Sequence, residues 1–198
     1  MARGRRVNSS GEKSKKLLLE KAIELFSTHG YHQTKISDIV KAAGLTQPTF
    51  YLYFQSKESM FNDLNEKFQN DLIEIFSNKD ETARDDKNST ALIEQNLKCI
   101  FDYFIENPNL TKIGFYEADQ STVVKQLLVS KLESIIETDL KDYAVVKRVN
   151  TNVLAQSIVG SMERLTLTNL LTNESNPEKL AQEISTIYFA NEHKLVHQ

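Results

Sequence analysis

The side chains that most often carry out catalysis or bind metals are scarce in this sequence. Two of its four histidines, His29 and His32, flank a predicted turn, and the other two, His193 and His197, lie near the C-terminal end. Cys99 is the only cysteine, so the sequence contains neither an intrachain disulfide nor a paired-cysteine zinc motif. Nucleophile-elbow, phosphate-loop, dinucleotide-binding and paired-histidine zinc motifs do not occur. We therefore predict a protein that is not an enzyme and that uses no metal and no cofactor.

Length and composition predict an all-α fold. The chain has 198 residues, of which 40% are hydrophobic, with only six glycines and three prolines. Such a composition favours helices and supplies enough apolar side chains for a core. Arg3, Arg5 and Arg6 precede no apolar signal region, and no segment approaches the roughly 18 apolar residues of a membrane span. We expect a cytoplasmic protein without a membrane partner.

Charge is divided unevenly along the chain. Residues 1–60 hold ten Lys or Arg and five Asp or Glu, whereas residues 61–198 hold fourteen and twenty-two. A basic segment attracts phosphate and an acidic remainder is repelled by it, which orients a molecule on approach to a polyanion. A basic segment that is merely solvated is the alternative. We interpret residues 1–60 as one domain with a basic N-terminal arm and residues 61–198 as a second domain.

Apolar spacing predicts three helices in the first domain. The apolar stripe of residues 14–28 ends at Gly30, which suits a helix C-terminus because glycine tolerates a positive φ. A second helix begins near Thr34, the expected N-cap, and stops at Gly44. Pro48 suits the first turn of a third helix because it lacks the N–H that is unpaired there. Two short helices joined by a tight turn form a helix-turn-helix, whose second helix lies in the DNA major groove.

Residues 30–60 resemble the DNA-binding domain of the TetR family. The segment GYHQTKISDIVKAAGLTQPTFYLYFQSKESM has, in order and spacing, the family's Gly-aromatic, Thr, Asp-Ile, Ala-Gly, Thr-hydrophobic-Tyr-x-Tyr-Phe and Ser-Lys-Glu positions. The remainder of the chain matches the family only in length and helical pattern. The resemblance implies about nine helices, which form a three-helix DNA-binding domain and a larger C-terminal domain for effector binding and dimerisation.

The resemblance also assigns residues to DNA contacts. By position, Gln47, Pro48 and Thr49 open the recognition helix and meet base edges. Glutamine can pair with adenine, threonine can bond to a base, and proline offers an apolar surface to a thymine methyl. Further contacts, mostly to phosphate, are expected from Thr34, Lys35, Ser37, Thr46, Tyr51, Tyr53 and Lys57. Lys35 occupies a position where the family often has a capping Thr or Ser, so we assign the cap to Thr34. An ordinary surface role is the alternative for each residue.

The family's effector site lies in the larger domain. Ligand pockets are mostly apolar with a few placed polar groups. On this basis the candidate ligand-binding residues are Asn96, Tyr103, Phe104, Phe115, Tyr116 and Arg164. Aromatic residues at helical spacing also fill ordinary cores, which is the alternative for each of them.

The last two long helices, expected over residues 152–171 and 177–192, carry apolar faces that suit either a dimer interface or a monomer core. We hypothesise a homodimer formed through these helices that binds a palindromic operator in double-stranded DNA. It acts as a repressor and releases the operator when a small-molecule effector binds. Two alternatives stay open: a DNA-binding regulator without an effector, or a helical-bundle enzyme or interaction module with a vestigial DNA-binding head.

Overall fold

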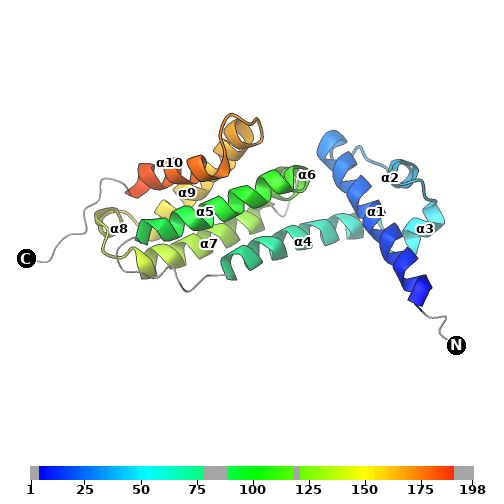
Figure 1. Ribbon diagram of the computed structural model, residues 1–198, viewed down its shortest axis with the longest axis horizontal. Helices are drawn as coiled ribbons and strands as arrows, with labels where there is room; N and C mark the ends of the chain where they lie inside the picture. The colour runs from blue at the N-terminus through cyan, green and yellow to red at the C-terminus, as the bar shows by residue number, and fades with distance from the viewer. Residues whose placement is uncertain (1–4, 78–88, 118–120, 190–198) are drawn as a thin grey trace, which may run out of the picture. The chain divides into compact units, whose positions relative to one another are not determined.

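The computed structural model describes residues 5–77, 89–117 and 121–189, which form helices joined by turns and loops and contain no strand (Figure 1). The elements in chain order are α1 (Arg5–His29), α2 (Ile36–Ala42), α3 (Gln47–Tyr51), α4 (Lys57–Ser77), α5 (Ser89–Glu106), α6 (Pro108–Lys112), η2 (Ile113–Glu117), α7 (Ser121–Asp139), α8 (Ala144–Arg148), α9 (Thr151–Leu165), η3 (Thr166–Leu170) and α10 (Pro177–Phe189). The two η segments are π-helical turns that continue α6 and α9. The all-α prediction is confirmed, and α8 is the helix that the sequence did not predict.

The chain forms two compact units. The first comprises residues 1–69 and 109–120, and the second comprises residues 70–108 and 121–198. Besides the predicted DNA-binding domain, the first unit therefore includes the next turns of α4 and the π turn η2. Helix α4 contributes residues to both units.

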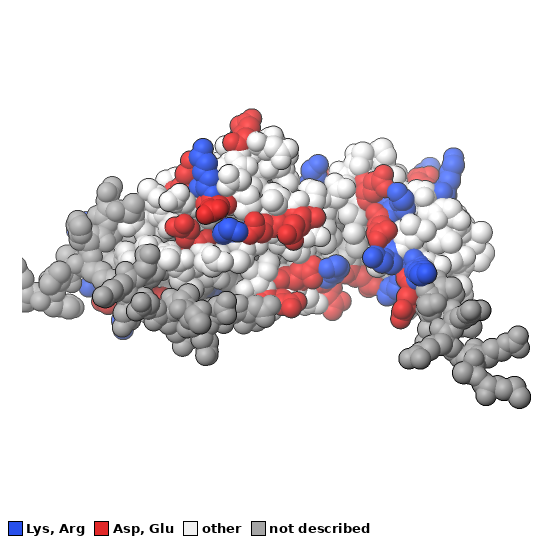
Figure 2. Space-filling model, in the orientation of Figure 1, with Lys and Arg blue, Asp and Glu red and all other residues white. Residues whose placement is uncertain are grey.

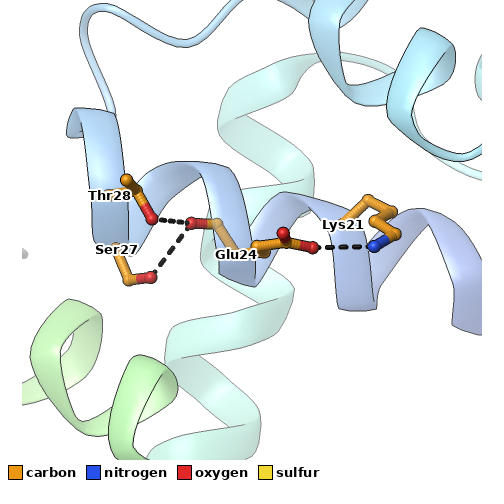
Figure 3. A network of polar contacts seen from close by, with 4 residues as sticks. All are labelled: Lys21, Glu24, Ser27 and Thr28. Atoms are coloured by element: carbon orange, nitrogen blue, oxygen red, sulfur yellow. Dashed lines mark hydrogen bonds and ion pairs between the residues drawn. The ribbon is translucent and has the colours of Figure 1, made fainter.

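The end of α1 is fixed by side-chain bonds to its own backbone (Figure 3). The hydroxyls of Ser27 and Thr28 donate to the carbonyl oxygen of Glu24 at 3.0 and 2.7 Å, and Lys21 donates to the Glu24 carboxylate at 2.7 Å. Gly30 then adopts φ 81°, the left-handed conformation that ends many helices. The predicted C-terminus of this helix is confirmed.

At its other end, α1 begins at Arg5 rather than at residue 14. The expected basic arm is therefore helical from Arg5 onward, and Arg3 lies outside the described residues. Residues 5–13 contain few apolar side chains, so the apolar periodicity that predicted the rest of the helix does not extend to them.

The cap of α2 differs from the prediction. Lys35 is the N-cap residue, and its backbone N–H is bonded by the side chain of Asp38 at 3.1 Å. Thr34 is 2% exposed, and its hydroxyl donates to the carbonyl oxygen of Gly30 at 2.9 Å. The assignment of the cap to Thr34 is therefore wrong, because its hydroxyl turns back toward the end of α1.

Helix α4 begins as predicted, with Ser56 as its cap. The Ser56 hydroxyl accepts from the backbone N–H of Ser59 at 3.0 Å, and the Ser59 hydroxyl accepts from the backbone N–H of Ser56 at 3.1 Å. Within the first unit, α4 packs closely against η2, because a Cβ added at Gly114 would lie 2.7 Å from Cγ of Phe68. No side chain fits at residue 114 without a shift of the buried Phe68 ring.

In the second unit, α5 packs against α10 and α7 packs against α9. These four helices run alongside one another in Figure 1. The sequence predicted one helix over residues 122–143, but α7 ends at Asp139 and Tyr143 adopts an extended ψ of 139° before α8. The Tyr143 ring is buried against Phe189, with ring centroids 6.1 Å apart. This packing holds Tyr143 outside the helical conformation.

Most of the apolar face of the last two long helices lies inside the subunit. Five predicted members of this face are buried: Leu154, Ile158, Met162, Leu180 and Ile184. Two others, Val153 and Ile187, are 54% and 72% exposed. For the five buried residues, the monomer-core alternative is correct. Val153 and Ile187 remain available to a partner.

Candidate nucleic-acid interface

The short helix α3 exposes most of its polar residues to solvent. Thr46 caps it by accepting from the backbone N–H of Thr49 at 3.4 Å, and the two threonine hydroxyls lie 2.9 Å apart. Phe50 is fully buried and anchors the helix to the core. Gln47 and Pro48 are exposed in the first turn, where the helix presents its N-terminal end. This arrangement leaves the Gln47 amide available to a base edge.

The C-terminal end of α3 carries two exposed large side chains. Tyr51 is 57% exposed, as a contact with DNA requires, and Leu52 is 76% exposed. The sequence analysis did not name Leu52 as an exposed residue. Leu52 lies outside the apolar stripe of Phe50 and Phe54, and this position could have indicated that its side chain is not part of the core. The half-buried Tyr53 lies against α1, since a Cβ added at Gly11 would be 3.4 Å from its hydroxyl oxygen.

The predicted contacts of α2 divide into exposed and buried residues. Lys35 and Ser37 are exposed, and the Ser37 hydroxyl lies 3.4 Å from a carboxylate oxygen of Asp38. Thr34 is buried with its hydroxyl bonded inside the unit. We therefore correct the prediction for Thr34: its side chain supports the loop between α1 and α2 and does not face a partner.

Lys57 has contacts that the sequence did not indicate. Its ammonium group donates to the carbonyl oxygens of Tyr31 at 2.7 Å and Thr34 at 2.9 Å, and it lies 4.2 Å from the centroid of the Tyr31 ring. Lys57 thus ties the start of α4 to the loop that precedes α2. Its predicted contact with a phosphate stays a prediction.

Charges of both signs cover the face of the first unit seen in Figure 2. Some basic residues of this unit are paired, as Lys15 is with Asp63 at 3.9 Å. Lys35 and Lys41, at the two ends of α2, are exposed. In the same view, acidic side chains gather in a row over the second unit. Lys35 and Lys41 are thus basic side chains of the first unit that an approaching phosphate can reach.

The six predicted ligand-binding residues are divided between the two units. Phe115 is buried and Tyr116 half-buried in the first unit, whereas the other four belong to the second. Among these four, Phe104 is fully buried and Arg164 is exposed. An inward-facing Arg164, which would have indicated an acidic or polar effector, is therefore absent.

Two polar candidates already have partners inside the second unit. The Asn96 amide donates to the carbonyl oxygen of Leu92 at 2.7 Å, and the Tyr103 hydroxyl donates to Asp71 at 2.8 Å. Burial, followed by the bond to Asp71, raises the pKa of Tyr103. Tyr103 therefore keeps its proton and holds the last part of α4 to α5.

Two cavities of the second unit lie elsewhere. One, of about 560 Å³, is lined by residues of α7 and α9, including the ion pair of Lys125 and Glu163. The other, of about 450 Å³, lies between α10 and the segment α9–η3. None of the six candidates lines either cavity.

Within the described residues, no group of histidine, cysteine and acidic side chains is arranged to hold a metal ion. The described helices also include none that is long and apolar enough to span a bilayer.

Comparison with known proteins agrees with this geometry. The family of bacterial regulatory proteins called the tetR family matches residues 18–64. YdgC, an uncharacterised helix-turn-helix-type transcriptional regulator of Bacillus subtilis, is 34% identical over 181 residues, which are 90% of this chain and 92% of YdgC. These similar proteins are regulators, which confirms the prediction that the chain is not an enzyme.

Solved structures show the same fold. A tetR-family regulatory protein from Rhodococcus superimposes with a TM-score of 0.74 at 14% identity, over 89% of this chain and 95% of that one. A gamma-butyrolactone receptor gives a TM-score of 0.66 at 17% identity, over 90% and 99%. The matched helix-turn-helix, the similarity along nearly the whole of YdgC and the shared fold lead to one conclusion: the chain belongs to the TetR family of DNA-binding transcriptional regulators.

Proposed function

We propose that this regulator is a homodimeric repressor that binds a palindromic operator and leaves it when a small-molecule effector binds. The observation that carries the DNA-reading part is the exposure of Gln47 and Pro48 on a helix anchored by Phe50. Thr49 and Tyr51 complete the DNA-facing set, with Lys35, Ser37 and Thr46 beside it. Such a protein acts in the cytoplasm, where bacterial DNA lies.

Each α3 places few groups in the groove, so a single copy reads only a short sequence. Two copies related by a twofold axis read two half-sites about 34–36 Å apart, one turn of DNA. Exposed apolar side chains on α9, η3 and α10 support a partner surface in the second unit: Val153, Leu167 and Ile187. We assign the dimer interface to this surface.

The effector is proposed to act on the second unit. The buried hydroxyl of Thr166, at the start of η3, has no hydrogen-bond partner among the described residues, and π turns are frequent at functional sites. A structural neighbour is described as a gamma-butyrolactone receptor, which supports a small-molecule effector for a protein of this fold. The chemical class of the effector stays open.

Helix α4 is the proposed connection between the effector and DNA. Its first part belongs to the unit that reads DNA, and its last part is bonded to α5 through Asp71 and Tyr103. An effector that moves the equilibrium from nearly all bound to nearly all released must favour the released state by roughly 5 kcal/mol. Differential affinity for the two states, rather than tight binding alone, therefore determines release.

The experiment begins with DNA fragments recovered by genomic footprinting, and it measures their affinity by fluorescence anisotropy at fixed salt. We expect the double substitution Gln47→Ala with Tyr51→Ala to weaken operator binding by about a hundredfold or more, because each lost base or phosphate contact costs about 1–3 kcal/mol. Both side chains are exposed, so the Tm is expected to stay within a few degrees of the parent value.

Gln126→Ala on α7 is the control, because it removes an exposed glutamine from the second unit. Operator affinity should be unchanged in this variant. If the double variant bound the operator as tightly as the parent, α3 would not be the reading helix. If no small molecule released the operator, the regulator would belong to the class that works without an effector.

A further inference from the structure

A cavity of about 520 Å³ lies within the first unit, apart from the DNA-facing side of α3. Its walls come from three segments: the loop between α1 and α2, the first turns of α4, and the end of η2. It is therefore bounded both by the loop that leads into the helix-turn-helix and by the segment η2 that packs on α4.

The least exposed polar residue on the wall of this cavity is Asn65, at 2%. Neither its amide nitrogen nor its carbonyl oxygen has a hydrogen-bond partner in the described part of the chain. Buried amides are nearly always bonded, and an unpaired one is destabilising. Both atoms are themselves almost inaccessible, so a bound molecule reaches them only if the Asn65 side chain turns toward the cavity, where it can both donate and accept.

The other residues that line the cavity indicate which charge and shape a bound molecule would need. Glu58 and Glu117 bring two carboxylates, and His32 is the one titratable base among the lining residues. Tyr31 and Phe61 form an apolar side, with ring centroids 4.4 Å apart. The Tyr31 ring already accepts one cation, the ammonium group of Lys57 at 4.2 Å.

Glu117 is exposed, and its carboxylate is only partly desolvated. Desolvation raises the pKa of Glu117, and the nearby Lys112 opposes the shift without cancelling it. Lys112 offsets only part of the desolvation of this carboxylate. A cation bound in the cavity would stabilise its charged form further.

We propose that this cavity is a binding site for a small organic cation, an amine attached to an apolar or aromatic group, held by Glu58 and Glu117 and by the amide of Asn65. The site is separate from the effector site proposed for the second unit, and each can exist without the other. Since its walls include the loop before α2, occupancy would join that loop to α4 and η2.

The test uses the full chain and three probes of one shape: benzylamine, benzyl alcohol and benzoate. Binding is followed by the rise in Tm with probe concentration and by the side-chain amide signal of Asn65 in an NMR spectrum. We expect benzylamine to raise the Tm by several degrees and to shift the Asn65 signal, whereas the neutral and anionic probes do neither.

Two substitutions locate the effect. Glu117→Gln should weaken benzylamine binding about tenfold, because it removes a charged acceptor of similar shape. Asn65→Leu should abolish the response to benzylamine and also raise the Tm of the free protein, because it removes an unpaired amide at nearly constant volume. Glu66→Gln is the matched control, since Glu66 is an exposed acid on the same helix that does not line the cavity.

Equal responses to the three probes would overturn the proposal, as would benzylamine binding that survives both Asn65→Leu and Glu117→Gln. No response to benzylamine would also overturn it. The operator affinity of the free protein is measured in parallel. If that affinity is intact while benzylamine fails to bind, the result refutes this site and leaves the proposed function standing.

Discussion

The two units of the molecule use their polar side chains differently. In the first unit, Phe50 of α3 is buried in the core, whereas Gln47 and Tyr51 of the same helix are exposed. In the second, Asn96 and Tyr103, the polar residues predicted to meet an effector, already bond to groups of the same unit. The α3 residues proposed to face DNA are thus available to a partner, whereas these two predicted effector residues already have partners.

Unpaired buried groups show a second difference. In the first unit, both amide atoms of Asn65 lack partners and the residue lines a cavity. In the second, the unpaired Thr166 hydroxyl lies outside the two cavities described there. Of these two unpaired side chains, only Asn65 therefore belongs to the wall of a described cavity.

The largest expected effect concerns the partner surface of the second unit. The double substitution Val153→Glu with Ile187→Glu should raise the dimer dissociation constant by about a hundredfold or more, because it buries two charges per subunit in an apolar interface. Analytical ultracentrifugation measures this constant. Val123→Glu is the control, because Val123 on α7 is 53% exposed and Val153 is 54% exposed. A double variant that stays as dimeric as the parent would show that the surface on α9 and α10 faces solvent.

A pair of glycines tests how tightly each unit is packed. Gly114→Ala should lower the free energy of unfolding by about 1–3 kcal/mol, because the new Cβ collides with the ring of Phe68. Gly160→Ala on α9 should raise it by about 0.5–1 kcal/mol, because nothing lies within 4 Å of its Cβ and alanine favours helix. Urea unfolding measures both values. A Gly114→Ala variant as stable as the parent would mean that η2 is not held against α4.

The smallest expected effect is a pH dependence at the cavity of the first unit. Desolvation raises the pKa of Glu117 in the folded state, so folding favours its protonated form. The resulting stabilisation is present at low pH and is lost as the pH rises through the folded-state pKa. Glu117→Gln should therefore gain in Tm relative to the parent between about pH 4 and pH 7. A difference in Tm that is constant over this range would show that Glu117 is fully hydrated.

Local rules predicted the first unit well, because its features depend on neighbours in the chain. Gly30 ends α1, Ser56 caps α4 and Pro48 opens the recognition helix, each through contacts within a few residues. Thr34 is the exception. Its spacing suggested a cap, but its hydroxyl bonds back to the end of α1.

The second unit was predicted less completely, because apolar periodicity does not say which face meets which neighbour. Leu154 and Val153 follow each other in one predicted apolar face, yet the first is buried and the second is exposed. Likewise, no local pattern predicted that Tyr143 packs on Phe189 and interrupts a long helix.

The sequence by itself determined the helical fold, the helix-turn-helix and the polar side chains exposed on α3, because helix spacing, caps and turns are encoded by residues close together in the chain. The tertiary structure alone decided which polar groups have partners. Tyr103 meets Asp71 across 32 positions, and Lys57 meets Tyr31 across 26. It also left Asn65 without a partner beside a cavity. Such pairings depend on how distant helices pack, and no local pattern records that packing.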